Sequence, residues 1–419
     1  MRRSSSAVPS SGHAGRALLA ALVVAACGRA AGDAPRDAAG GRDHLFVWTR
    51  SADTTQADFL AVLDVTEPAD DTARYGRLVT TLPVPGLQNV PHHTEHEMPA
   101  DGQLFANGFA TGRSFVFDLR DPAAPRIAAE FGEVDGYSHP HSFLRMPDGH
   151  VLATFQMQHA ADGTMRAGGL VEMTPDGQRV RSVSADVPGA DDSLRVYSAG
   201  IVPALDRIVT TSTDMMEDAE ASRTLQVWKL SDLSYLTSIR LDGPNGRLSA
   251  EPRLLADGRT VLVSTFSCGL FLLEGLDGAR PSARQVASFP RKDDTNCAIP
   301  VVVGHYYLVT VPAWSAVIVL DVADPAAPRE VSRVAFGPDD VPHWIAASPD
   351  GRRVVLTGYE AMQHTVHLLR FDPGTGQLTR DARFRSEGAT EGGFRMDDRT
   401  WPHGGNAKGI PHGAVFSRR

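Results

Sequence analysis

The sequence contains few of the residues that several common functions require. Only three of its 419 residues are cysteine, 7% are aromatic, and the formal net charge is -9. It has no long basic stretch, so nucleic acid is not an expected partner. It also lacks a glycine-rich phosphate loop, a Gly-x-Ser-x-Gly nucleophile elbow and a Cys-x-x-Cys pair. Dinucleotide binding and acyl transfer therefore have no support in the sequence.

Short apolar runs and turn residues are abundant instead. The chain has 39 glycines and 28 prolines, and no long amphipathic helix of period 3.6 is visible. Residues 115–126 (FVFDLRDPAAPR) and 318–329 (IVLDVADPAAPR) are near copies, and residues 63–68 are a weaker one. About seven such units, roughly 45–50 residues apart, indicate an all-β, seven-bladed β-propeller. A two-domain β-sandwich is the alternative that this repeat count disfavours.

Histidines precede three Asp-Gly turns at a nearly constant offset. The segments are HHTEHEMPADG (92–102), HSFLRMPDG (141–149) and HWIAASPDG (343–351). Asp-Gly favours the positive-φ turn of a hairpin, and the first strand of a propeller blade lines the central channel. We therefore expect these imidazoles, which enter just before the first strands, to meet at one mouth of the channel. Imidazole is the commonest protein ligand for transition metals, so the pattern predicts a metal site.

The candidate metal ligands also have ordinary structural interpretations. His139 and His141 are two residues apart and would share one face of a strand, which is equally compatible with an exposed polar face. His343 lies beside Trp344 and is compatible with a packed structural histidine. Adjacent side chains of a strand point to opposite faces, so we expect His92 and His93 to bind one metal together only if they lie in a loop. The candidates are His92, His93, His139, His141, His343 and His412. Other repeats carry Tyr197, Ser198, Glu251 and Cys297 at this phase.

The N-terminus is typical of a bacterial lipoprotein signal. Arginines flank the start of an apolar segment at residues 17–27 that is too short to span a bilayer and ends in Val24-Ala25-Ala26-Cys27. We expect a signal peptide at residues 1–26, a flexible tether at 27–43 and the propeller at 44–419. Lipid on Cys27 would anchor the protein to the periplasmic side of the outer membrane. A plain secretory signal and a soluble secreted protein are the alternative.

Cys268 and Cys297 are the other two cysteines. In an oxidising compartment such a pair often forms a disulfide, although sequence cannot show the required geometry. A channel-facing Cys297 thiol that binds copper, or an inert buried cysteine, are the alternatives.

Four segments resemble the selenium-binding protein family, whose bacterial members include copper-dependent methanethiol oxidases. They are PHHTEH (91–96), SHPHSFLRMPDGHVLATF (138–155) with its later GGLVEM, PHWIAASPDGRRVVLTG (342–358), and the tail from residue 391 containing PHGAVF. The resemblance implies a seven-bladed propeller, a histidine-bound copper, and oxidation of a small sulfur-containing substrate such as methanethiol by oxygen. Copper is also the tightest divalent occupant expected for imidazole ligands.

By position, the family's ligands fall on His92, His93, His141 and His412. Two departures concern the chemistry: Glu95-His96-Glu97-Met98 replaces the family's cysteine-rich segment, and His343 stands where the family commonly has glutamine. A non-catalytic lipoprotein propeller that binds metal or a partner is the main alternative. A divalent-metal hydrolase is disfavoured, because it usually needs Asp, Glu and Asn ligands.

We predict that Cys27 is lipidated after removal of residues 1–26. The wild-type protein should incorporate palmitate during metabolic labelling, whereas Cys27→Ser should not, because only the thiol at this position fits the lipobox. Equal labelling of the two proteins would contradict the prediction.

Overall fold

The computed structural model describes residues 42–67, 74–160, 162–187, 194–215, 222–291, 297, 299–338, 340–358, 364–397 and 399–418. The predicted signal peptide, Cys27 and the tether as far as residue 41 lie outside the described residues.

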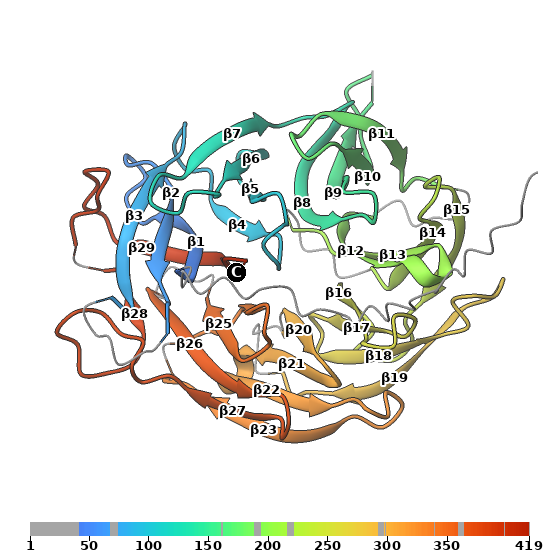
Figure 1. Cartoon of the computed structure of the whole chain (residues 1–419). Helices are drawn as coiled ribbons and strands as arrows, with labels where there is room; N and C mark the ends of the chain where they lie inside the picture. The colour runs from blue at the N-terminus through green and yellow to red at the C-terminus, as the bar shows by residue number, and fades with distance from the viewer. Residues whose placement is uncertain are drawn as a thin grey trace, which may run out of the picture. The chain divides into compact units, whose positions relative to one another are not determined.

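The described strands form seven antiparallel sheets, which confirms the predicted all-β, seven-bladed propeller. Figure 1 shows the sheets arranged radially around a common centre. Blades 1 to 4 run from the inner to the outer strand as follows: β4 (Pro91–Thr94), β5 (Gln103–Gly108), β6 (Arg113–Asp118), β7 (Arg126–Phe131); β8 (Tyr137–Arg145), β9 (Val151–His159), β10 (Met165–Met173), β11 (Arg179–Ser184); β12 (Val196–Val202), β13 (Arg207–Ser212), β14 (Thr224–Lys229), β15 (Tyr235–Arg240); β16 (Ser249–Leu254), β17 (Val261–Thr265), β18 (Gly269–Glu274), β19 (Ser282–Ser288).

The remaining three blades include the one that closes the circle. Their strands are β20 (Pro300–Val303), β21 (Tyr306–Val311), β22 (Ala316–Asp321), β23 (Arg329–Ala335) in blade 5; β24 (Trp344–Ala347), β25 (Arg353–Thr357), β26 (Thr365–Asp372), β27 (Gln377–Arg380), with β28 (Phe394–Arg395), in blade 6; and β29 (Gly409–Phe416), β1 (His44–Ser51), β2 (Phe59–Asp64), β3 (Arg77–Pro83) in blade 7. The last strand of the chain thus pairs with the first.

The Asp-Gly turns connect the first two strands of their blades, as their sequence predicts. Gly102, Gly149 and Gly351 have φ values of 68°, 91° and 66°, in the left-handed region that residues with a Cβ rarely adopt. The two Asp-Pro segments instead connect the third strand to the outer strand in blades 1 and 5. These turns repeat the same four-stranded unit and so set the spacing of the histidines along the chain.

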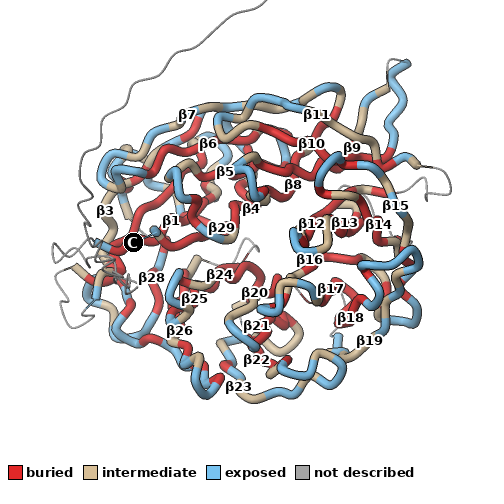
Figure 2. The backbone as a smooth tube through the Cα atoms, turned by 45° about the vertical axis from the view of Figure 1, so that its right-hand side comes forward, coloured by how far each residue is buried: buried red, intermediate tan, exposed pale blue. Residues whose placement is uncertain are grey.

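The outer strand of a blade is its most exposed part. Inner strands such as β4 and β29 are buried throughout, whereas outer strands such as β7 alternate between exposed and half-buried residues (Figure 2). The apolar clusters lie between adjacent blades: Trp48 of blade 7 packs edge-on against Phe115 and Phe117 of blade 1, with ring centroids 5.7 and 5.4 Å away. Face-to-face packing of sheets therefore holds the inner strands in place.

Helical elements among the described residues are two short 3-10 turns, at Pro203–Leu205 and Pro312–Trp314. In the described part of the chain, no helix has the length and apolarity needed to cross a bilayer.

A buried ion pair fastens the closing blade to its neighbour. Asp43, directly before β1, lies 2.9 Å from the guanidinium of Arg353 on β25, and both side chains are almost fully buried. Arg353 also donates a hydrogen bond to the carbonyl oxygen of Val65 at 2.6 Å. Blades 6 and 7 are thus joined by polar contacts as well as by apolar packing.

We expect Asp43→Ala to lower the free energy of unfolding by about 3–5 kcal/mol, because it leaves a buried guanidinium without its counter-charge. Glu330→Ala is the matched control, since it removes an exposed partner of Arg333 and should cost about 1 kcal/mol or less. Denaturant unfolding of the two variants measures the difference. Equal losses in both would show that the Asp43 pair does not fasten the closure.

Candidate metal centre

The inner strand of blade 1 contains a β-bulge at the paired histidines. Pro91 pairs with Gly108 and Thr94 pairs with Ala106, so His92 and His93 together face the single residue Asn107. Two residues opposite one define a bulge, which leaves a backbone group without its ladder partner. The side-chain oxygen of Asn107 fills this gap by accepting the backbone N–H of His93 at 2.7 Å.

The bulge brings adjacent side chains onto one side of the strand. The imidazoles of His92 and His93 stack with their centroids 4.3 Å apart and their planes 3° apart. The expectation that two adjacent histidines could share a metal only from a loop is therefore wrong. Both lie within a strand, and the broken alternation of the bulge is the physical reason.

The same two-against-one register recurs in four more inner strands. In each strand, two residues at the channel face one residue of the neighbouring strand. The pairs are His141 and Ser142 opposite Thr154, Tyr197 and Ser198 opposite Thr211, Ala250 and Glu251 opposite Ser264, and His412 and Gly413 opposite Trp48. In blades 2, 3 and 4 a hydroxyl of the facing residue accepts the backbone N–H of the second bulge residue. The bulge is thus a repeated device that aims side chains at the centre.

Five imidazoles meet at this centre. We call His92, His93, His141, His343 and His412 the histidine cluster. The ring centroid of His92 lies 4.8 Å from that of His141, 4.4 Å from that of His412 and 6.4 Å from that of His343. His343 directly precedes β24, as predicted, whereas the other four lie inside their strands. Residues that are up to 320 positions apart thereby form one group.

Burial keeps the histidine cluster neutral. All five side chains are at least nine-tenths buried. Desolvation lowers the pKa of each, to about 3 for His141 and about 4 for His412, and the neighbouring imidazoles lower the pKa of His92 and His93 further. At neutral pH the nitrogens therefore carry lone pairs, which is the form that binds metals.

Hydrogen bonds orient two of these rings. Nδ1 of His412 lies 2.5 Å from the carbonyl oxygen of His92, and because a carbonyl only accepts, Nδ1 carries the proton. The lone pair of the neutral His412 ring is then on Nε2. Nδ1 of His141 lies 3.2 Å from the hydroxyl of Ser142. In each ring one nitrogen makes this contact and Nε2 is left to bind a metal, as is usual for histidine ligands.

The donor set fits a transition-metal ion. In the groups His92–His93–His141 and His92–His343–His412, one ligand nitrogen from each ring lies within 4.8 Å of the others. Nitrogen ligands bind metals at about 2.0–2.1 Å, so two of them on one ion lie at most about 4 Å apart and only small shifts are needed. Among the described residues, Nδ1 of His92 and Nε2 of His93 and His141 have no hydrogen-bond partner. A buried polar atom without a partner is costly, and a metal would satisfy it.

Aromatic rings surround the cluster. Tyr197 lies 4.0 Å from His141, Trp344 lies 4.9 Å from His93, and Phe109 lies 5.4 Å from His92, measured between centroids. They add apolar surface around the buried imidazoles. A cavity of about 550 Å³ lined by residues such as Arg42 and Arg120 has none of the five histidines in its described lining.

His139 does not join the other candidates. Its φ is +55°, so the strand turns there, and its half-buried ring lies beside Phe109 with centroids 6.0 Å apart. The expectation that His139 and His141 share a strand face is therefore wrong, because regular alternation ends at the left-handed residue and the bulge that follows.

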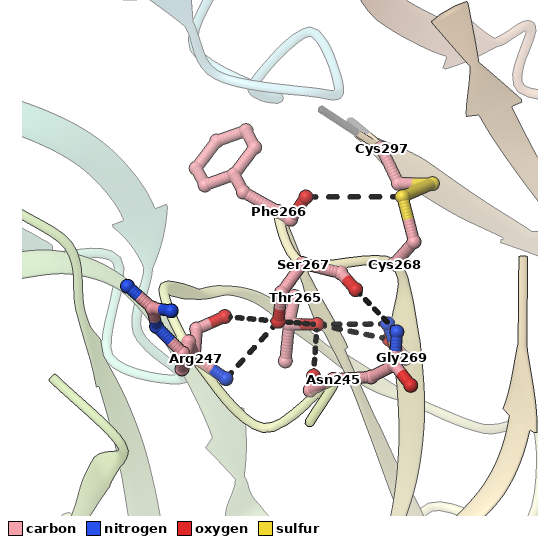
Figure 3. Close-up of a disulfide and its surroundings, with 8 residues drawn as sticks. All are labelled: Asn245, Arg247, Thr265, Phe266, Ser267, Cys268, Gly269 and Cys297. Atoms are coloured by element: carbon pink, nitrogen blue, oxygen red, sulfur yellow. Dashed lines mark hydrogen bonds between the residues drawn. A yellow bond between two sulfur atoms is a disulfide. The ribbon is translucent and has the colours of Figure 1, made fainter. Parts of the chain in front are cut away.

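Cys268 and Cys297 are joined in a disulfide between blades 4 and 5 (Figure 3). Both residues are buried, and the backbone N–H of Cys297 donates to the carbonyl oxygen of Phe266 at 3.3 Å. Of the alternatives open for this pair, the structure contains the disulfide, so neither sulfur is available as a thiolate ligand.

Sequence reasoning missed the residues that support the site. Asn107 holds the bulge at His93, and His96 stacks on Trp344 with centroids 4.2 Å apart. The signal for Asn107 was weak, because a polar residue near the end of a short strand, QLFANG, is as compatible with a turn as with a supporting role.

Known proteins are similar to this chain in sequence or in fold. No protein-family model matches the chain. Methanethiol oxidase from Hyphomicrobium sp is 24% identical over 350 residues, covering 76% of each chain. A hypothetical selenium-binding protein from Sulfolobus tokodaii has a TM-score of 0.71 at 18% identity, covering 90% of this chain and 94% of the other.

The periplasmic gluconolactonase of Pseudomonas aeruginosa has a TM-score of 0.62 at 14% identity, covering 90% of this chain and 99% of the other. At these identities the solved structures establish the propeller fold alone. The sequence match to methanethiol oxidase extends over 76% of each chain. The chain is therefore similar in sequence to a methanethiol oxidase and in fold to a selenium-binding protein.

Proposed function

We propose that this protein is a copper-dependent oxidase of a small thiol such as methanethiol. The observation that carries the proposal is the convergence of five buried, neutral imidazoles from blades 1, 2, 6 and 7. The likeness to methanethiol oxidase supports the choice of substrate class. When bound, copper would supply one-electron redox chemistry, with oxygen as the final electron acceptor.

The donor chemistry favours copper over the metals of hydrolases. Both described triads at the centre consist of nitrogen donors only, and imidazole binds copper more tightly than the other divalent first-row ions. Calcium and magnesium prefer oxygen ligands. Structural likeness to a gluconolactonase therefore supports the common fold and not a common reaction.

The protein's own residues would hold the rings and shape the space around them. Asn107 fixes the bulge of His92 and His93, and Ser142 orients His141. The aromatic rings of Tyr197 and Trp344 leave a dry, largely apolar surrounding, which suits a substrate with a small alkyl group.

The segment that replaces the family's cysteine-rich stretch has other contacts here. The buried Glu95 forms an ion pair with the half-buried Arg145 at 2.8 Å, and His96 stacks on Trp344. With Cys268 and Cys297 in a disulfide, the proposed copper site depends on imidazole alone.

We also propose a location. If Cys27 is lipidated, the tether anchors the propeller to the periplasmic side of the outer membrane, where thiols and oxygen diffuse freely. This part of the proposal rests on the sequence of the signal segment.

Removal of His93 or His141 should lower copper content at least about tenfold, because each supplies a nitrogen to the same group. His367→Gln is the matched control: this histidine is also buried but lies on β26, where its Nε2 contacts Asp340 at 3.2 Å. Elemental analysis after copper loading, with oxygen consumption on methanethiol, measures both properties. Equal copper in all variants would contradict the site. Copper retained without thiol oxidation by the wild type would favour a metal-binding role without catalysis.

Acid should destabilise the metal-free protein through the histidine cluster. The unfolded chain binds protons on these residues below about pH 6.5, whereas the folded chain, with lowered pKa values, does not. The stabilising contribution is therefore complete above about pH 6.5 and is lost as pH falls towards 4. Each such histidine costs about 1.4 kcal/mol per pH unit in this window.

Thermal unfolding of the apoprotein between pH 7.5 and 5 tests this expectation. His141→Gln should flatten the pH dependence of the melting temperature, because it removes one of the histidines whose pKa is lowered. A wild-type melting temperature that does not fall on acidification would refute the argument.

A further inference from the structure

Glu251 occupies the position in blade 4 that His93 occupies in blade 1. Each is the second residue of an inner-strand bulge, and the N–H of each donates to a side-chain oxygen of the facing residue, Ser264 or Asn107. Because the blades repeat around one axis, equivalent positions direct their side chains the same way. Glu251 therefore faces the centre from the side of the propeller opposite to the paired histidines.

Only one of the two carboxyl oxygens of Glu251 has hydrogen-bond partners among the described residues. Oε2 accepts hydrogen bonds from the hydroxyl of Ser198 at 2.8 Å and from Nη1 of Arg253 at 2.7 Å. Oε1 has no hydrogen-bond partner among the described residues, although only 1% of the side chain is exposed. A polar oxygen that is buried without a hydrogen-bond partner is costly, so we expect a bound group to supply the missing partner.

Tyr197 connects Glu251 to the histidine cluster. Its ring lies 4.0 Å from that of His141, and its buried hydroxyl likewise has no partner in the described part of the chain. A tyrosine hydroxyl is a hydrogen-bond donor, and Ser198, the next residue in the same bulge, bonds Glu251 at 2.8 Å. Tyr197, Ala250 and Phe266 also form a buried apolar cluster. One donor, one acceptor and an apolar wall thus lie together beside the imidazoles.

We propose that Glu251 is the catalytic proton acceptor for the substrate thiol, with Tyr197 as a hydrogen-bond donor to the same group. This inference rests on the proposed function and adds the path of the proton. The S–H bond of the thiol breaks, its electron pair stays on sulfur, and the proton forms an O–H bond with Oε1. No oxidation occurs in this step, and the thiolate is left next to the histidine cluster. Ser198 and Arg253 are positioning residues, because they act only through Glu251.

Proton release on thiol binding tests the inference without turnover. Copper-loaded protein is titrated with methanethiol under anaerobic conditions by calorimetry in two buffers of different ionisation enthalpy. The wild type should release no net proton to the buffer, because Glu251 retains it. Glu251→Gln should release about one proton per thiol bound, and Glu251→Asp should behave like the wild type, since it keeps a carboxylate.

Turnover supplies the second readout. Glu251→Gln should keep its copper and lose about 100-fold in the rate of oxygen consumption, the lower range for general-base catalysis. The loss should be smaller with 2,2,2-trifluoroethanethiol than with ethanethiol, because the fluorinated thiol is more acidic and similar in shape. Glu172→Gln is the matched control: Glu172 is buried and paired with Arg181 at 2.5 Å, but lies on the third strand of blade 2.

The outcomes separate this inference from the proposed function. Equal proton release by the wild type and Glu251→Gln would overturn the assignment of Glu251, whatever the rate of oxidation. Loss of copper from Glu251→Gln would also overturn it, because Glu251 would then be a metal ligand. A wild type that retains the proton and a Glu251→Gln variant that releases it, with no oxidation of the thiol by the wild type, would overturn the proposed oxidase and support the role of Glu251.

Discussion

A repeated break in the β-ladder is the constraint on which the centre of this protein depends. A regular antiparallel strand alternates its side chains, so it can present only every second residue to the channel. In five of the described inner strands, two residues face one, and the strand turns an adjacent pair inward at the same level. Side-chain oxygens such as that of Asn107 satisfy backbone groups that the break releases. Without the bulges, His92 and His93 would lie on opposite faces of β4.

The blades supply the second requirement, which is a dry centre. Five imidazoles in one small volume would repel one another if they were protonated, and burial removes the water that would stabilise their charge. Face-to-face packing of the blades and the closure of β1 on β29 prevent the inner strands from relaxing apart. The fold therefore holds several unprotonated nitrogens at short range, an arrangement that is unfavourable unless something binds them. Equivalent positions of the blades carry different groups. Blades 1, 2, 6 and 7 contribute imidazoles, whereas blade 3 contributes the hydroxyl of Tyr197 and blade 4 the carboxyl group of Glu251.

Much of this arrangement could be predicted from the chain. The Asp-Gly and Asp-Pro repeats predicted the seven-bladed propeller, because each needs a specific backbone conformation at a fixed place in the blade. The constant offset of His141 and His343 from their turns predicted that they meet, since equal offsets mean equal positions. His139 shows the limit of this reasoning. Strand alternation placed it with His141, but its left-handed conformation is set by contacts that no local pattern reveals.

The sequence by itself determined the repeat, the strand order within each blade and the residue types at the central phase, because these follow from local turn chemistry and from periodicity along the chain. Only the tertiary structure decided which of those residues touch. The bulges arise where two strands differ by one residue between paired positions, which is a property of the pair and not of either strand. Burial depends on blades that are distant in sequence. It keeps the histidine cluster neutral and leaves one carboxyl oxygen of Glu251 without a partner among the described residues. Those quantities come from packing around an axis, which a linear pattern does not contain.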